Sequence, residues 1–251
     1  MIRVLIDACL LVKGNVSNAM FDLGRAGLIS LHWTPEIGIQ FIENWGRLRA
    51  QDEAREGLKK HQYSFTPADE ERALSGAKSR ALTRLGKFRL MAPEWAIPGW
   101  DASKARRAHP EKELLVGEPG GVHRGDYDVA LAAIKLAEVF PKDEIWLATD
   151  NMQHLPPAIL SKFDVWSVGQ GTMLEELHKL KPLLVEQSLQ TTLDDMRNPQ
   201  ITRMDMLDIL SNPVEFGSSV LSDHMRQLWQ SSQASGKTRR KNQPLDEGPS
   251  R

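Results

Sequence analysis

The amino-acid sequence predicts an α/β protein with three layers, in which helices cover both faces of a central parallel sheet. Short apolar, β-branched runs, which are typical of buried parallel strands, alternate with longer amphipathic segments. Strands that alternate with helices are joined by right-handed crossovers, so the sheet is expected to be parallel. Towards the C-terminus the pattern becomes entirely helical, which predicts a helical extension behind the sheet.

The first fifty residues carry clear signals for the start and end of each element. They predict a strand over 4–6, a helix over 15–27, a strand over 28–33 and a helix that begins at Pro35. Gly27 ends the first of these helices. Thr34 precedes Pro35, and a capping residue before a proline is a strong helix start.

Residues 50–125 read as an insertion of helix and loop. A helix opens at Pro67 and carries a basic stretch. The cations considered for contact with RNA phosphates are Arg80, Arg84, Lys87 and Arg89, although a solvated helix face explains them equally well. Residues 93–125 are rich in Pro, Gly and charge and predict a long, partly ordered loop. Its Trp95 and Trp100 are expected to pin this loop to the core more readily than to stack on bases.

Regular alternation returns at Asp126. The predicted elements are a helix over 129–139, a strand over 144–148, a polar turn over 149–151, a helix over 157–162, a strand over 164–168 and helices over 172–195 and 202–211. We therefore divide the chain into an α/β domain over 1–175, a helical extension over 176–229 and a disordered tail over 230–251, which is rich in Ser, Gln, Lys and Pro.

Composition limits the function classes. The formal net charge is −1, so contact with nucleic acid requires a local basic face. The single cysteine, Cys9, excludes an internal disulfide framework and suits a reducing compartment. No apolar run approaches the length of a membrane span and no secretion signal is evident, so we expect a cytoplasmic protein without a membrane partner.

Acidic residues follow the predicted strands. Asp7 ends the first strand, Asp126 opens the helix that leads to the next strand, and Asp150 follows that strand. Ligands bind outside the carboxyl ends of the strands in open α/β sheets, and Glu43 on the second helix could reach the same crevice. Clustered carboxylates without a cysteine or histidine cluster favour Mg²⁺ or Mn²⁺, and a pair of such ions can hydrolyse a phosphodiester. Taken singly, each acid is explained equally well as a turn former or a helix cap.

Several segments, in this order, resemble those of the PIN-domain family. The matching segments are Ile6-Asp7-Ala8-Cys9-Leu10-Leu11, Ala26-Gly27-Leu28, Trp33-Thr34-Pro35-Glu36-Ile37, Glu43 with Leu48, Asp126-Tyr127-Asp128-Val129-Ala130 and Leu147-Ala148-Thr149-Asp150-Asn151 through His154-Leu155-Pro156. The resemblance covers roughly residues 1–50 and 124–175. Residues beyond 180 are similar to the helical extension of a longer subset of the VapC-type toxins in this family.

The resemblance implies a Mg²⁺-dependent (or Mn²⁺-dependent) ribonuclease. Asp7, Glu43 and Asp126 occupy the family's acidic positions; its fourth position falls on Asn151, with Asp150 beside it. Asp128 stands where the family usually has a histidine and is an additional candidate carboxylate. A VapC-type toxin would cleave RNA, be held silent by a cognate antitoxin, and could pair with a second copy of itself.

Some alternatives stay open at this stage. The Thr149 hydroxyl could orient a ligand or simply bond the turn, whereas Cys9 is better explained as a small buried thiol than as a nucleophile, because no Cys-His pairing is visible. Haloacid-dehalogenase phosphatases also end their first strand in an aspartate, but they need a second acid two residues later, where this chain has Cys9. The remaining rival is a PIN fold without catalytic activity that binds RNA or a protein partner.

Overall fold

The computed structural model describes residues 1–61, 66–196 and 200–241. Its strands are β1 (Ile2–Ile6), β2 (Ser30–His32), β3 (Glu144–Ala148) and β4 (Val165–Val168). Its α-helices are α1 (Ala8–Val12), α2 (Gly14–Arg25), α3 (Pro35–His61), α4 (Pro67–Met91), α5 (Ala102–Ala108), α6 (Tyr127–Val139), α7 (Pro157–Leu160), α8 (Gln170–Leu180), α9 (Pro182–Asp195), α10 (Arg203–Ser211) and α11 (Ser219–Lys241). Two short 3₁₀ helices cover Arg124–Asp126 and Ser161–Phe163.

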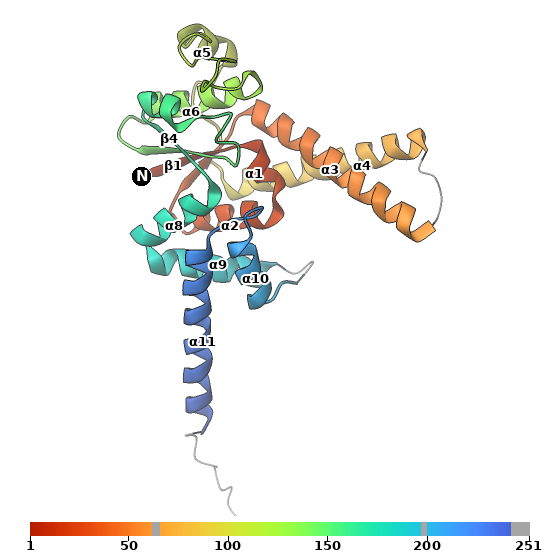
Figure 1. Ribbon diagram of the computed structural model, residues 1–251, viewed down its shortest axis with the longest axis vertical. Coiled ribbons are helices and arrows are strands. Elements are labelled where there is room, and N and C mark those ends of the chain that lie inside the picture. Colours follow the sequence, from red (N-terminus) through yellow and green to blue (C-terminus); the bar gives the residue numbers. More distant parts are fainter. Residues whose placement is uncertain (62–65, 197–199, 242–251) are drawn as a thin grey trace, which may run out of the picture.

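The four strands form one parallel sheet in the order β2-β1-β3-β4, which confirms the predicted fold class. Helix α6 packs on one face of the sheet, whereas α2, with α9 against it, lies on the other (Figure 1). β1 and β3 are buried because their apolar side chains face helices on both sides; Val4, Leu5, Ile6 and Leu147 are fully buried. The core is therefore continuous from the sheet into both helical layers.

The strand order places a topological switch point between β1 and β3. From β1 the chain crosses to β2 on one side, and β3 and β4 are then added on the other side. The two central strands pair in register, with Ile6 opposite Ala148. At such a switch point the loops that follow the two strands lead to opposite sides of the sheet. The crevice between these loops is the usual ligand site of an open α/β sheet.

The insertion is more ordered than the sequence predicts. α3 extends to His61 and lies along α4, and the two helices form an arm that projects from the sheet (Figure 1). The expected loop over 93–125 includes α5 and makes a parallel bridge between Trp33 and Ala96. Trp95 stacks on the buried Trp33 at 5.2 Å and Trp100 Nε1 donates to Glu36 at 2.9 Å, so both tryptophans pin this segment to the core as expected.

The helical extension differs from the sequence prediction at two points. The helix expected over 172–195 is two helices, because Pro182 starts α9 and turns the preceding Lys181 away from helical geometry. Residues 230–241, expected to be disordered, continue α11. Residues 197–199, in the segment between the two helices predicted there, and 242–251 of the expected tail lie outside the described residues.

None of the described helices combines the length and the apolar character that crossing a bilayer requires.

Candidate functional site

Asp7 is the centre of the site at the switch point. It follows β1 directly, and its backbone N–H donates to the Ala148 carbonyl at 3.1 Å, which continues the β1–β3 pairing. It occupies the N-cap position of α1, yet its side chain makes no capping bond. The carboxylate is therefore not used as a helix cap and is turned to other partners.

Hydroxyl and thiol groups hold the Asp7 carboxylate. Thr149 Oγ1 donates to Asp7 Oδ2 at 2.8 Å, and Cys9 Sγ lies 3.1 Å from the same oxygen. Asp7 is only 5% exposed. Burial raises the pKa of Asp7 above its ordinary value, the bonds from Thr149 and Cys9 oppose this shift, and the charge of Asp126 raises the pKa further. The described residues thus bury a carboxylate beside a second carboxylate.

Thr149 connects Asp7 to the turn after β3. Its hydroxyl accepts a bond from the Asn151 backbone N–H at 2.9 Å, and its own N–H donates to the Val168 carbonyl. Its side chain is completely buried. Of the two roles considered from the sequence, the turn role is present in the structure, and the same hydroxyl orients Asp7.

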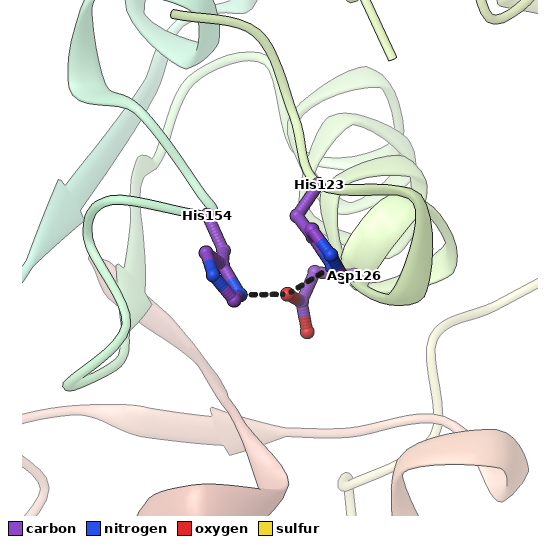
Figure 2. Close-up of side chains that lie close together, drawn as sticks. All are labelled: His123, Asp126 and His154. Carbon is purple, nitrogen blue, oxygen red and sulfur yellow. Dashed lines mark hydrogen bonds and ion pairs between the residues drawn. The ribbon is translucent and has the colours of Figure 1, made fainter. Parts of the chain in front are cut away.

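Asp126 reaches the site from the other side of the crevice. It stands at the N-cap of α6, again without a side-chain capping bond. Its Oδ2 lies 3.0 Å from His154 Nδ1 and 3.6 Å from His123 Nδ1 (Figure 2). The same oxygen lies 3.4 Å from Asn151 Nδ2. The side chains of Asp126, His123 and His154 each offer one ligand atom, and these atoms lie within 4.8 Å of one another.

A backbone link holds the two loops of the site together. The N–H of His123 donates to the carbonyl of His154 at 2.8 Å, and the two imidazole rings stack with centroids 4.2 Å apart. His154 is in turn placed by the turn after β3, since its N–H donates to the Asn151 carbonyl at 3.0 Å. Two histidines therefore join the predicted residues, although the sequence indicated no histidine cluster. The signal was present: His123 lies three residues before Asp126 and His154 three residues after Asn151.

Asp150 lies at the edge of this group. It forms an ion pair with Lys13, and the Lys13 ammonium also donates to the backbone carbonyl of Val214. Lys13 therefore connects the loop before α11 to the turn that follows β3. Asp150 is thus paired with a cation, Lys13. The sequence analysis did not identify Lys13 as a residue of the site.

Two further predicted acids, Glu43 and Asp128, form ion pairs with basic side chains. Glu43 pairs with Lys78 of α4 at 2.5 Å, because the Lys78 stem packs over the side-chain-free face at Gly46. Asp128 forms a two-pronged ion pair with Arg106, at 2.8 and 2.6 Å. In the described part of the chain both carboxylates are thus paired with cations of the insertion.

The four cations of α4 that were considered for contact with RNA divide into two sets. Arg80, Arg84 and Lys87 follow one another at helical spacing and line one hollow of about 340 Å³ beside α2. Arg84 donates to Ser17 Oγ at 3.1 Å, and Arg80 pairs with Glu53. Arg89 does not line this hollow; its guanidinium lies over the ring of Trp95 at 4.8 Å.

Cys9 is a partly buried thiol that packs against the core. Burial raises its pKa strongly, and the neighbouring charge of Asp7 adds to the shift. A thiol that resists ionisation is a poor nucleophile, because the thiolate is the reactive form.

Comparisons with protein-family models, with curated proteins and with solved structures gave no match for this chain.

Proposed function

We propose that the chain is a metal-dependent ribonuclease that hydrolyses RNA phosphodiesters at the crevice between β1 and β3. The observation that carries this proposal is the pair Asp7 and Asp126, one of them almost fully buried, at the switch point of a parallel sheet. An ionised carboxylate in such a place is costly unless a cation compensates it. The resemblance to PIN-domain proteins favours the same residues.

The donor groups around Asp126 fit a divalent cation. His154 Nδ1 lies 2.7 Å from the Asn151 amide and 3.0 Å from the Asp126 carboxylate. One ring nitrogen cannot accept from an amide and donate to a carboxylate at the same time. If the Asn151 amide is assigned with its oxygen toward the group, lone pairs of three side chains converge, as they would around a cation.

Asp7, Asp126, Asn151 and His154 would hold this cation, with His123 beside them. Carboxylate and amide oxygens suit Mg²⁺ and Mn²⁺, and the imidazoles shift the preference toward Mn²⁺. When bound, such a cation supplies Lewis acidity toward the phosphodiester and the attacking water.

The surrounding residues would prepare the site. Thr149 and Cys9 keep the Asp7 carboxylate turned into the crevice, and the Asn151 turn sets the position of His154. Lys13 neutralises Asp150, which limits the number of uncompensated negative charges that a phosphate would meet. The hollow of Arg80, Arg84 and Lys87 is a place where the RNA backbone can bind through its phosphates.

The test is single-turnover cleavage of a mixed RNA substrate with Mg²⁺ or Mn²⁺, with and without EDTA, by the parent chain and Asp126→Asn. We expect cleavage that needs metal and that the substitution abolishes. RNA binding without cleavage in the parent chain would favour the rival function, a PIN-like fold that binds RNA without hydrolysing it.

A matched pair of variants tests Glu43. Glu43→Gln and Glu53→Gln each remove one ion pair between α3 and α4, with Lys78 and Arg80 respectively. If Glu43 turns into the site when metal and RNA bind, only Glu43→Gln lowers cleavage. Equal activity of the two variants would restrict Glu43 to its structural pairing with α4.

We also propose a protein inhibitor, as expected for a toxin of this type. A basic side chain that enters the crevice would compensate Asp7 and Asp126 in place of a cation. Co-purification with the products of neighbouring genes should recover a small inhibitor that suppresses cleavage. Recovery of the chain alone, without toxicity on overexpression, would contradict the toxin role.

A further inference from the structure

A second group of metal-ligating side chains lies in the helical extension. His178 comes from α8, Glu186 from α9 and His224 from α11. His178 Nε2 is 3.2 Å and His224 Nε2 is 2.7 Å from the same oxygen, Glu186 Oε1. The three helices thus direct one ligand atom each to a common point, which has no part in the site between β1 and β3.

The packing of the helices fixes these side chains in place. Each ligand is adjacent in sequence to a residue that is at most 1% exposed: Leu177 beside His178, Val185 beside Glu186 and Met225 beside His224. The Glu186 side chain is itself only 12% exposed, and the two imidazole rings meet edge to face at 4.6 Å. The group therefore lies at the rim of a packed interface, with Glu186 largely buried and His224 at the surface.

The spacing of the ligand atoms suits a small transition-metal ion. Ligand atoms bonded to one tetrahedral ion at about 2.0–2.2 Å lie roughly 3.4 Å apart. The His178–Glu186 separation of 3.2 Å is close to this value, the His224–Glu186 separation of 2.7 Å is a hydrogen bond that would lengthen around an ion, and all three ligand atoms lie within 4.8 Å of one another. Two imidazoles and one carboxylate form a set that binds Zn²⁺ or Co²⁺ well and Mg²⁺ poorly.

We propose that His178, Glu186 and His224 form a transition-metal site, of the Zn²⁺ type, that clamps α11 onto α8 and α9. Three protein ligands leave at least one coordination position for water or a further ligand. Since α11 projects from the rest of the extension (Figure 1), a cation at its first turns ties its base to α8 and to α9, which packs against α2.

The experiment is a Co²⁺ titration of the full chain after removal of metals with a chelator, followed by visible absorption. It is performed in an Asp126→Asn background, so that the first site does not contribute. His224→Gln is the main variant, because this side chain is 44% exposed and its replacement leaves the core intact. The control is His109→Gln. His109 contacts Glu113 through Nδ1 and Glu138 through Nε2, so its two glutamate partners lie at different ring nitrogens and the three side chains do not direct their ligand atoms to one point.

We expect one Co²⁺ per chain, with ligand-field bands that one equivalent of Zn²⁺ removes. Affinity should fall at least tenfold in His224→Gln and in Glu186→Gln and stay unchanged in His109→Gln. Zn²⁺ should also raise the melting temperature of the background chain and leave that of His224→Gln unchanged, which tests the clamp on a folded variant. Absence of Co²⁺ and Zn²⁺ binding at micromolar concentrations, or equal binding by all variants, would overturn the proposal.

Discussion

Replacement of Asp7 by Asn tests separately how much the buried carboxylate destabilises the fold and how much it contributes to cleavage. In a metal-free buffer the variant removes an acidic group that is 5% exposed and that lies beside Asp126. The asparagine oxygen can still accept the bond from Thr149 and the contact from Cys9. Exchange of a charged for a neutral acceptor costs about 1 kcal/mol. Desolvation of an uncompensated carboxylate costs several kcal/mol. We therefore expect Asp7→Asn in EDTA at pH 7 to be more stable than the parent chain by about 1–2 kcal/mol.

The pH dependence follows from the direction of the pKa shift. Because the pKa of Asp7 is raised in the folded chain, the fold binds this proton more readily than the unfolded chain does. The destabilisation by Asp7 is therefore absent below the unfolded pKa. It develops as the pH rises through the folded pKa and is complete above it. The advantage of Asp7→Asn should shrink as the pH falls, and denaturant unfolding at several pH values measures it.

The same substitution should abolish cleavage. Loss of a ligand removes charge neutralisation and water activation together, and several kcal/mol corresponds to a rate that is lower by a factor of at least about 100. Asp22→Asn is the matched control: Asp22 is also buried and accepts a bond from a threonine, Thr192 at 2.7 Å, but it lies on α2 against α9. A variant at Asp7 that cleaves as fast as this control, or that is clearly less stable than the parent chain in EDTA, would refute the reasoning.

Three further predictions concern separate parts of the molecule. His154→Gln should lower cleavage with Mn²⁺ by about 10-fold or more relative to cleavage with Mg²⁺, because an imidazole ligand is lost; equal losses with both metals would exclude it as a ligand. Burial lowers the pKa of His32 to about 4, so the free energy of unfolding should fall by up to about 3 kcal/mol as the pH falls from about 6.5 to 4. His32→Gln should remove this pH dependence of the free energy of unfolding. If the dependence persists in the variant, other groups cause it. Gly171→Ala would place a Cβ 2.0 Å from the Phe216 carbonyl oxygen and should destabilise the fold by at least about 1–3 kcal/mol, whereas Gly86→Ala, with no atom within 4 Å, should be neutral or stabilising in thermal unfolding.

Local sequence determined the sheet and the half of the site that follows its strands. Each central strand is a short apolar run, and the residue after it is polar: Asp7 after β1, and Thr149 after β3. In a parallel sheet, neighbouring strands end at the same edge, so these residues meet once the fold class is known. Helix starts were also local, as at Thr34 and Thr66, where the side chain can bond its own backbone within three residues. The break at Pro182 was equally local, but the helical periodicity on both sides concealed it.

Tertiary structure alone decided which charged groups meet across long separations. Nothing in the local sequence of Glu43 or Asp128 indicates a basic partner, yet the arm of α3 and α4 and helix α5 bring Lys78 and Arg106 to them. Such pairings depend on where insertions fold back, because no periodicity links residues that far apart in the chain. The same holds for His123 beside His154, whose loops a single backbone bond connects. It holds most strongly for His178, Glu186 and His224, since three helices must pack before their ligand atoms converge.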